Sequence, residues 1–278
     1  MAITTLTQLS SSLLPPVYGN KVGTLTANGN TGFWHNLYVT GGFPPVATVP
    51  SVGLNGVALT SMTGAIPFQN PPAGQNTYLA GFTRGSAGDG FLTAQRSTLL
   101  IDRLWHNSGL DPNITTAQSL SSVDFAPRDI NGTINGEGVF VALEVTGTVN
   151  ATTPTMTLGY TNSNGDAGKT INTSNFYRPS IGAGWFTIFH LAAGDKGVRS
   201  IQSFTLSAAI GGSISLVAFR PIALLTSNSA SQRGFVYEDA LSLGLPRLYN
   251  DSVLHTINLS GGSGSIDSGS FSIQFAQG

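Results

Sequence analysis

Apolar and polar residues alternate along four segments in the middle of the chain, residues 138–149, 155–161, 200–208 and 213–221. In the first segment the apolar residues at every second position are Val139, Val141, Leu143 and Val145. A period of two residues is that of a β-strand, so each segment is predicted to be a strand. Pro154 lies between the first two segments, and Gly211 and Gly212 lie between the last two. Because Pro and Gly are typical of tight turns, the four strands are predicted to form two consecutive β-hairpins, to which the other strands add.

Further strands are predicted on both sides of this central region. Residues 184–191, 252–259 and 270–275 show the strand pattern, and a Gly/Ser-rich turn joins the last two. Residues 92–106 fit either a buried strand or a short helix, and a strand is favoured. One short helix is predicted at residues 238–243, because Gly244 and Pro246 end the pattern there.

Long irregular segments separate these elements. Residues 43–90 are rich in Gly and Pro and are too long for a plain connection, so they are predicted to lie on the surface and to be ordered by contacts within the subunit or with a partner. Residues 162–181 are predicted to be a long polar loop. Many short strands and no helical period of useful length predict an all-β fold, a jelly-roll-like β-sandwich with long Gly/Pro-rich loops.

The chain is predicted to contain an N-terminal arm, residues 1–17, and a single β-sandwich domain with loop insertions, residues 18–278. Pro15 and Pro16 end the arm and prevent a helix from continuing through them. The arm carries no charged residue, and its large apolar residues are Ile3, Leu6, Leu9, Leu13 and Leu14. It is predicted to be extended or a short first strand. Two roles remain open for it, contact with a neighbouring subunit or an ordinary start of the domain.

The composition indicates a surface that is poor in charge. Only 9% of the 278 residues are charged, against about 25% in an average globular protein, and Ser, Thr, Asn and Gly supply the polar surface instead. A monomer normally keeps a charged surface for solubility, so this composition suits a protein packed into an assembly. A secreted or adhesin-like β-protein shares it. The net charge is −1 and no Lys/Arg cluster is present, so no nucleic acid is expected as a partner.

Cysteine is absent, so neither a disulfide nor a thiolate metal site can form. This fits folding in a reducing cytoplasm. The N-terminal segment lacks the basic residues and the long apolar core of a signal peptide. No run of about 18 apolar residues is present, so no membrane contact is predicted.

Three segments resemble a known class of proteins. They are L-G-Y-T-N-S-N-G-D-A-G-K-T (residues 158–170), A-G-D-K-G-V-R-S-I-Q-S-F-T-L-S (residues 193–207) and V-A-F-R-P-I-A (residues 217–223). Together they resemble virion structural proteins of tailed bacteriophages, nearest the head decoration or cement type, over about the middle third of the chain. The resemblance implies a β-sandwich located in the virion after assembly in the host cytoplasm. It implies the major capsid protein as partner and a homo-oligomer, with a trimer as the favoured state.

Two sets of residues are candidates for a ligand site. Residues 165–170, G-D-A-G-K-T, end like a phosphate-binding P-loop, but Ser163 stands where that motif requires Gly and the following residues do not predict a helix. A turn is therefore favoured. The four histidines lack the spacing of a zinc site and are expected to be hydrogen-bonded structural residues: His35, His106, His190 and His255.

Two carboxylates could also serve chemistry. Glu144 lies in a predicted strand among apolar neighbours, where a single carboxylate does not make the two-acid arrangement of a glycosidase, so an ion pair with Arg199 or Arg220 is favoured. Asp195 could contact calcium or fix its turn through side-chain to backbone hydrogen bonds, and the turn is favoured. No catalytic, cofactor-binding or metal-binding residue is predicted.

The favoured hypothesis is therefore a non-enzymatic protein, a decoration or cement subunit that binds the phage capsid surface and stabilises the head. The alternative is a phage fibre, spike or receptor-binding protein that recognises host glycans. Such sites stack sugars on exposed aromatic side chains, for which Trp34, Trp105, Trp185 and the tyrosines are candidates. An enzyme such as a glycan hydrolase has the weakest support.

Overall fold

A computed structural model describes residues 3–22, 33–86, 96–150, 152–173, 182–227, 235–260 and 269–278. Strands hold 47% of the residues and helices 6%, which confirms the all-β prediction and is consistent with the sandwich or jelly-roll class. The strands are β1 (Val17–Val22), β2 (Phe33–Asn36), β3 (Gly41–Phe43), β4 (Val57–Ala58), β5 (Thr77–Ser86), β6 (Arg96–Asn107), β7 (Gln118–Ser119), β8 (Phe140–Gly147), β9 (Met156–Asn162), β10 (Lys169–Thr173), β11 (Trp185–Ile188), β12 (Val198–Leu206), β13 (Ser213–Ser227), β14 (Phe235–Asp239), β15 (Arg247–Leu248), β16 (Leu254–Ser260) and β17 (Gly269–Gln277). The helices are α1 (Leu6–Ser12), α2 (Ala240–Leu243) and the 3₁₀ helix η1 (Leu37–Val39).

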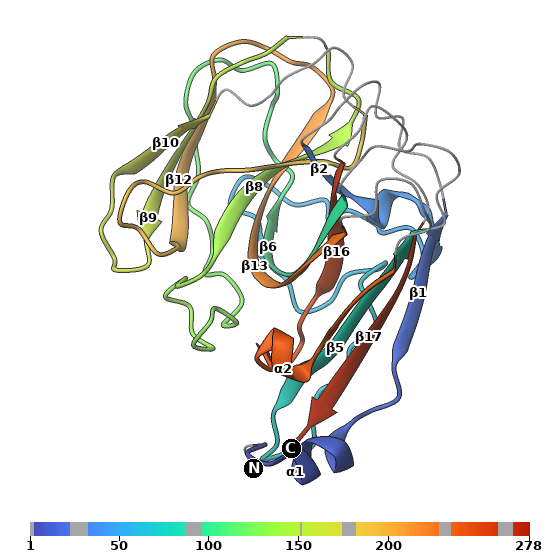
Figure 1. The fold of residues 1–278 in the computed structure, drawn as a ribbon. Helices are drawn as coiled ribbons and strands as arrows, with labels where there is room; N and C mark the ends of the chain where they lie inside the picture. Colours follow the sequence, from blue (N-terminus) through green and yellow to red (C-terminus); the bar gives the residue numbers. More distant parts are fainter. Residues whose placement is uncertain are drawn as a thin grey trace.

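A closed barrel lies at the centre of the molecule (Figure 1). Its strands follow the order β13-β8-β11-β2-β16-β6, and β6 pairs with β13 to close the ring. All of these pairs are antiparallel, and β4 adds to one edge of β6. Closure leaves few unpaired strand edges. Side chains at alternate positions form the barrel interior, which includes Ile101, Ala142, Phe186, Val217, Phe219 and Ile257.

The four-stranded sheet, in the order β10-β9-β12-β7, packs against one side of the barrel. Leu158 and Phe204 from this sheet contribute to one core cluster with Leu143 and Leu216 from the barrel. Strand β8 is therefore buried on both faces, because Ala142 faces the barrel interior cluster while Leu143 faces the neighbouring sheet.

The six-stranded sheet, in the order β14-β5-β17-β1-β3 with β15 paired to β5, packs on another side of the barrel. Phe82 and Ile273 from this sheet share a core cluster with Leu100 and Leu254 from the barrel. In Figure 1 the four-stranded sheet lies at the upper left, the barrel in the middle and the strands β5, β17 and β1 at the lower right. The barrel is thus the middle layer between two sheets.

The two predicted hairpins are wrong, although all four strands form. Strand β8 belongs to the barrel and β9 to the four-stranded sheet, and the same holds for β13 and β12. The described residues 148–150 and 152–155, and residues 207–212, therefore lie between strands of two layers, and the Asn150 amide donates to the Ile210 carbonyl. Alternation shows which face of a strand is buried, but it does not show whether the next strand pairs beside it or packs across the core from it.

The hairpin that does form joins β9 and β10, with Lys169 opposite Tyr160. Its turn and its second strand, β10, lie within residues 162–181, which were predicted to be a loop and of which residues 174–181 are outside the described part of the chain. The Gly/Ser-rich turn at residues 261–268 is outside it as well. The last two strands form, but β16 joins the barrel and β17 the six-stranded sheet. The strand predicted at residues 184–191 is shorter, because β11 ends at Ile188.

Three local predictions concern whether a segment is a helix or a strand. Strand β6 confirms the strand favoured at residues 92–106, of which 92–95 are not described. Helix α2 confirms the short helix before Gly244, whose φ of 68° ends it. The arm prediction is wrong in one respect, because residues 6–12 form helix α1. Thr5 and Gln8 form a capping box at the start of this helix. A Thr followed three residues later by a Gln is a helix-start signal in the sequence, which the prediction of an extended arm did not include. Neither this helix nor any other described one is long and apolar enough to cross a membrane.

Candidate functional site

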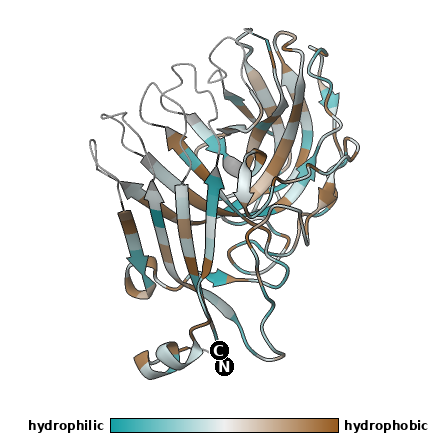
Figure 2. Ribbon diagram, turned by 90° about the vertical axis from the view of Figure 1, so that its right-hand side faces the viewer, coloured by the Kyte–Doolittle hydropathy of each residue, from teal (hydrophilic) through white to brown (hydrophobic). Residues whose placement is uncertain are grey.

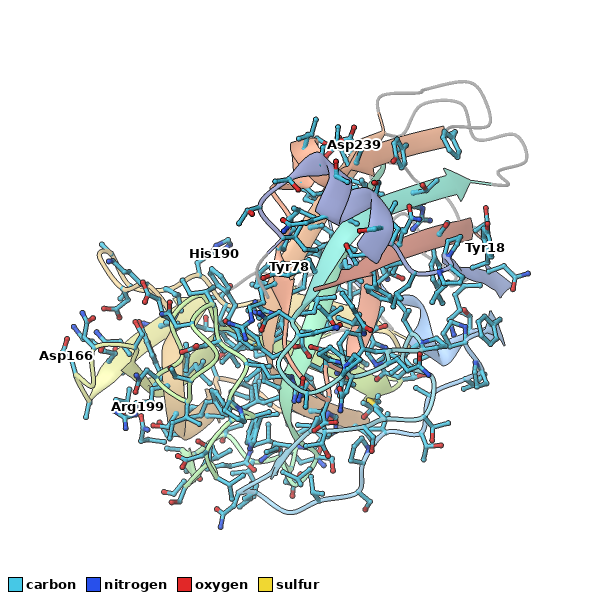
Figure 3. All side chains as sticks on the ribbon, turned by 90° about the horizontal axis from the view of Figure 1, so that it is seen from below. Tyr18, Tyr78, Asp166, His190, Arg199 and Asp239 are labelled. Atoms are coloured by element: carbon cyan, nitrogen blue, oxygen red, sulfur yellow. The ribbon has the colours of Figure 1, made fainter. Side chains whose placement is uncertain are left out.

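A buried ion pair lies inside the barrel. Arg103 Nη2 is 2.6 Å from Glu144 Oε2, and both side chains are fully buried. Arg103 Nη1 also donates to Glu144 Oε1 at 3.3 Å, and Asn36 Nδ2 donates to the same oxygen at 3.1 Å. The predicted ion pair of Glu144 is confirmed, but its predicted partners are wrong. Arg220 pairs with another carboxylate, and Arg199 is exposed on the four-stranded sheet, at the far left of Figure 3 with Asp166.

The groups around this ion pair are held in their neutral forms. The Arg103 guanidinium lies over the Tyr38 ring at 5.1 Å, and its Nη2 is 3.4 Å from His106 Nδ1. Burial, reinforced by Arg103, lowers the pKa of His106 to about 3. Burial, followed by Arg103 and Lys21, also lowers the pKa of His255 well below its ordinary value. Burial and the Glu144 carboxylate raise the pKa of Tyr38. All members of the cluster are buried, so none of its groups can be reached by a ligand from solvent. Its role is to hold the strands of the barrel together.

The four histidines do not form a site. His35, His106 and His255 are buried in β2, β6 and β16, whereas His190 is exposed beyond the end of β11. The expectation that each is hydrogen-bonded is not met at Nε2 of the three buried rings, which has no partner in the described part of the chain. Among the described residues no group of three His, Asp or Glu side chains could hold a metal ion.

The segment that ends like a P-loop forms the β9–β10 hairpin. Lys169 and Thr170 begin strand β10, so no helix presents amide groups to a phosphate, and the prediction of a turn is confirmed. Asp195 holds the neighbouring loop against this hairpin. It accepts from Tyr160 Oη at 2.5 Å and from Asn162 Nδ2 at 2.7 Å. These bonds lower the pKa of Asp195. The prediction was that Asp195 fixes its turn through side-chain to backbone hydrogen bonds; its carboxylate instead bonds to the side chains of Tyr160 and Asn162.

A second buried ion pair was not predicted. Arg128 donates to both oxygens of Asp102, from Nε at 3.0 Å and from Nη2 at 3.1 Å. Ser252 Oγ and the Val253 amide donate to the same carboxylate at 2.9 Å. The pair ties the loop before β8 to β6 and to the segment before β16. Arg128 lies in an irregular segment without periodicity, so the sequence pattern gave no signal for it.

A polar cleft opens beside this second pair. It has a volume of about 450 Å³ and is lined by residues 60, 75–77, 127–128 and 247–251. The Tyr249 ring forms part of its wall, with the guanidinium carbons of Arg220 and Arg247 at 5.1 and 4.8 Å from the ring centroid. Arg247 Nη2 donates to Asn76 Oδ1 at 2.5 Å. The cleft combines arginine, amide and hydroxyl side chains with the carboxylate of Asp251 and the apolar side chains of Pro127 and Leu248.

Exposed apolar side chains gather on the six-stranded sheet. Seven of the twelve large exposed hydrophobic residues lie on its strands, on helix α2 or on the arm: Leu6, Leu13, Tyr18, Phe43, Phe235, Tyr237 and Leu241. Tyr237, Thr83, Ser272 and Tyr18 lie opposite one another in four adjacent strands. These positions define the outer face of the sheet, because the alternate residues Phe82 and Ile273 belong to the core.

The outer face carries little charge. Among its described positions on β14, β5, β17 and β1, Asp239 is the only charged residue. Arg84 points the other way, and donates to Thr98 of the barrel. Figure 2 shows the strands of this sheet side by side with α1 below them, and Figure 3 shows Tyr18 and Asp239 toward opposite edges of it.

The tryptophans named as sugar-stacking candidates are not exposed platforms. Trp105 and Trp185 are buried, at 0% and 2% relative exposure, so that role is wrong for both. Trp34 packs against the barrel interior cluster. Of the other candidates, Tyr18 and Tyr237 are exposed, at 67% and 53%.

No protein-family model matches the chain, and no curated protein matches it. Solved structures to which it is similar include the D431N mutant VP2 protein of infectious bursal disease virus, with 13% identity, 95% of this chain and 78% of that chain covered, and a TM-score of 0.21. The structure of the Gt strain of that virus has 12% identity over 95% of this chain and 82% of that chain, with a TM-score of 0.20. These neighbours are viral capsid structures, but scores this low carry no argument about fold or function.

Proposed function

We propose that this chain is a non-enzymatic structural protein of a virion, attached to the surface of a phage head through the outer face of its six-stranded sheet. The observation that carries the proposal is the gathering of seven exposed apolar side chains on this sheet, α2 and the arm. A free surface of this kind favours association, because burying it removes apolar area from water at roughly 25 cal/mol per Å².

The arrangement of charge supports the same face. Strands β1 and β5 turn their cations, Lys21 and Arg84, inward: Lys21 is 5% exposed, and its Nζ donates to the Pro44 carbonyl at 2.6 Å. Because Asp239 is the single charge among the described outer positions of β14, β5, β17 and β1, this part of the face loses little hydration energy when a partner covers it. Ser270, Ser272 and Gln274 between the aromatic residues can hydrogen-bond to such a partner.

The resemblance to decoration or cement proteins supports the choice of partner. Its three segments fall on β9, β12, β13 and the turns around them, in the four-stranded sheet and the barrel. None of the three segments belongs to the six-stranded sheet or the arm, which we propose as the surface that contacts the major capsid protein. A homo-oligomer, with a trimer as the favoured state, belongs to the same proposal.

Binding to heads tests this proposal. Purified protein is mixed with phage heads that lack their own copy, and bound protein is measured after sedimentation. The proposal expects saturable binding with a fixed number of copies per head, which increases the temperature at which heads release their DNA. Binding to tails or fibres alone would instead favour the alternative, a fibre, spike or receptor-binding protein that recognises glycans.

A further inference from the structure

The cleft at β15 is lined by other residues than the exposed apolar side chains above and has its own chemistry. Of the two arginines that line it, Arg128 is neutralised by both oxygens of Asp102. Arg247 is different. Within the described part of the chain no carboxylate lies within 4.0 Å of it, and its hydrogen-bond partner there is the Asn76 side chain. The cleft therefore presents one guanidinium without an ion-pair partner, while its one lining carboxylate, that of Asp251, accepts from Asn70 Nδ2.

The guanidinium of Arg247 is held in position before any ligand arrives. It lies over the Tyr249 ring, and one nitrogen is fixed by Asn76 Oδ1 at 2.5 Å. Tyr249 is itself anchored, because its hydroxyl donates to the Ile130 carbonyl at 2.9 Å. The remaining N–H groups of Arg247 stay available, and a planar guanidinium matches a carboxylate through two parallel hydrogen bonds. A positioned donor loses less side-chain entropy when it binds.

The backbone of the same wall is constrained. Leu245 and Asp251, with φ of 50° and 60°, are the two non-glycine residues with positive φ among the described residues, and they flank the segment 246–250. This conformation is unfavourable for a Leu in particular. Asp251 is kept in place by Asn70, which donates from Nδ2 to Oδ1 at 2.7 Å and accepts from the Asp251 amide at 2.7 Å. Strained, fixed backbone of this kind clusters at ligand sites.

The other lining groups suit a sugar rather than a small inorganic anion. The side chains of Thr60, Gln75 and Asn250 line the cleft. None of them makes a hydrogen bond to another described residue, so all three can bond to a ligand. Amides and hydroxyls can each donate to or accept from sugar hydroxyls. Pro127 adds an apolar surface for the C–H face of a ring. A cleft of about 450 Å³ has room for a sugar ring and its substituents.

We propose that this cleft binds an acidic saccharide, whose carboxylate pairs with Arg247 and whose hydroxyls bond to the amides of Gln75 and Asn250. The cleft differs from the residues proposed for attachment: it lies on β15 and the neighbouring loops, and its lining includes none of the seven exposed apolar residues named above. A protein attached to a head through that face could hold such a saccharide on its free side.

The test compares three small probes on the full-length protein by NMR titration or calorimetry. D-glucuronate carries both the sugar and the carboxylate, D-glucose lacks the carboxylate, and acetate lacks the sugar. Glucuronate is expected to bind at least about tenfold more tightly than either of the other two, since a hydrogen-bonded charge pair is lost in one case and the hydroxyl contacts in the other. Arg247→Gln is expected to remove this advantage.

Two further variants keep the test decisive if Arg247→Gln disturbs Tyr249. Asn250→Ala removes a side chain without an internal hydrogen bond, so it is expected to weaken glucuronate binding at an unchanged melting temperature. Arg199→Gln removes an exposed arginine on the four-stranded sheet and is expected to leave binding unchanged. Equal binding of acetate and glucuronate, tighter binding of a tripeptide with a free carboxylate, or no binding of glucuronate would each overturn the proposal.

Discussion

Arg103 and Glu144 lie 41 positions apart in the sequence, yet their side chains meet inside the barrel with Nη2 and Oε2 2.6 Å apart. Each supplies the counter-charge that the other needs, because an unpaired charge is costly at a fully buried position. Asn36 completes the contact from a third strand, so the cluster fixes how β2, β6 and β8 meet. The chemistry of this cluster is structural rather than catalytic.

Replacing one member of the pair is expected to destabilise the protein strongly. Glu144→Gln leaves the Arg103 guanidinium buried without a counter-charge, which typically costs about 3–5 kcal/mol of the free energy of unfolding. Urea unfolding followed by circular dichroism measures this cost. Glu238→Gln on the edge strand β14 is the matched control and should change stability by less than about 0.5 kcal/mol. A similar small change for Glu144→Gln would show that the pair is not needed to balance the barrel interior.

The buried histidines predict a loss of stability in acid. Burial lowers the pKa of His106 to about 3 and that of His35 to about 4, whereas both titrate near 6.5 in the unfolded chain. Between these values the unfolded state binds more protons than the folded state, so the free energy of unfolding decreases as the pH falls below about 6.5. Each histidine contributes a slope of up to about 1.4 kcal/mol per pH unit.

Melting temperatures measured from pH 7 to pH 4.5 check this dependence. His106→Gln removes one titrating group, so its melting temperature should fall less steeply with pH than that of the wild type. His190→Gln changes an exposed histidine and should leave the slope as it is. If His106→Gln and the wild type follow the same slope, His106 does not titrate as the structure indicates.

The positions of the strands could be predicted from the sequence more fully than their pairing partners. Alternation located β8, β9, β12 and β13, because side chains at every second position of a strand share one face and each of these strands packs an apolar face against a core. The pairing depends on which layer each strand enters, and the turn residues near Pro154 and Gly211 are equally compatible with a hairpin and with a crossing between layers. The barrel closure of β6 on β13 is such a long-range pairing and has no local signal.

The side-chain clusters were predicted less completely for a similar reason. Glu144 stood out because a carboxylate is unusual in an apolar strand, but its partner depends on strand register, which placed Arg103 rather than Arg220 beside it. Tyr249 and Arg247 lie in a short irregular segment where Tyr and Arg are ordinary surface residues. Only the fold brings them to Asn76 and Arg220.

The outer face should lose binding when its apolar side chains become polar. Tyr237→Ser combined with Leu241→Ser changes residues that are 53% and 85% exposed, so the fold should keep its melting temperature. Sedimentation with heads is expected to show at least about tenfold weaker binding, since two large apolar contacts are lost. Ile114→Ser combined with Val123→Ser is the control, because these residues are 40% and 43% exposed away from the six-stranded sheet. Equal loss in both double variants would argue against a specific face.

The arm should contribute to attachment more than to folding. Helix α1 has no buried residue, so a chain that begins at Leu13 is expected to keep the melting temperature of the full chain and to bind heads less tightly. A chain that begins at Tyr18 also loses Leu14 and Val17, which pack against the core of the six-stranded sheet. Its stability should therefore fall by about 1–3 kcal/mol. Unfolding of the chain that begins at Leu13 would make the arm part of the fold instead.

The most direct measurement is a reconstruction of a head saturated with this protein, by electron cryomicroscopy at a resolution that separates the strands. The account predicts density on the outer surface of the capsid, with the outer face of the six-stranded sheet and α1 against the major capsid protein. Tyr18 and Tyr237 would then lie within the contact, and the cleft at Arg247 would remain open to solvent. Density in which this sheet faces solvent, or in which the protein occupies only the tail or its fibres, would contradict the account.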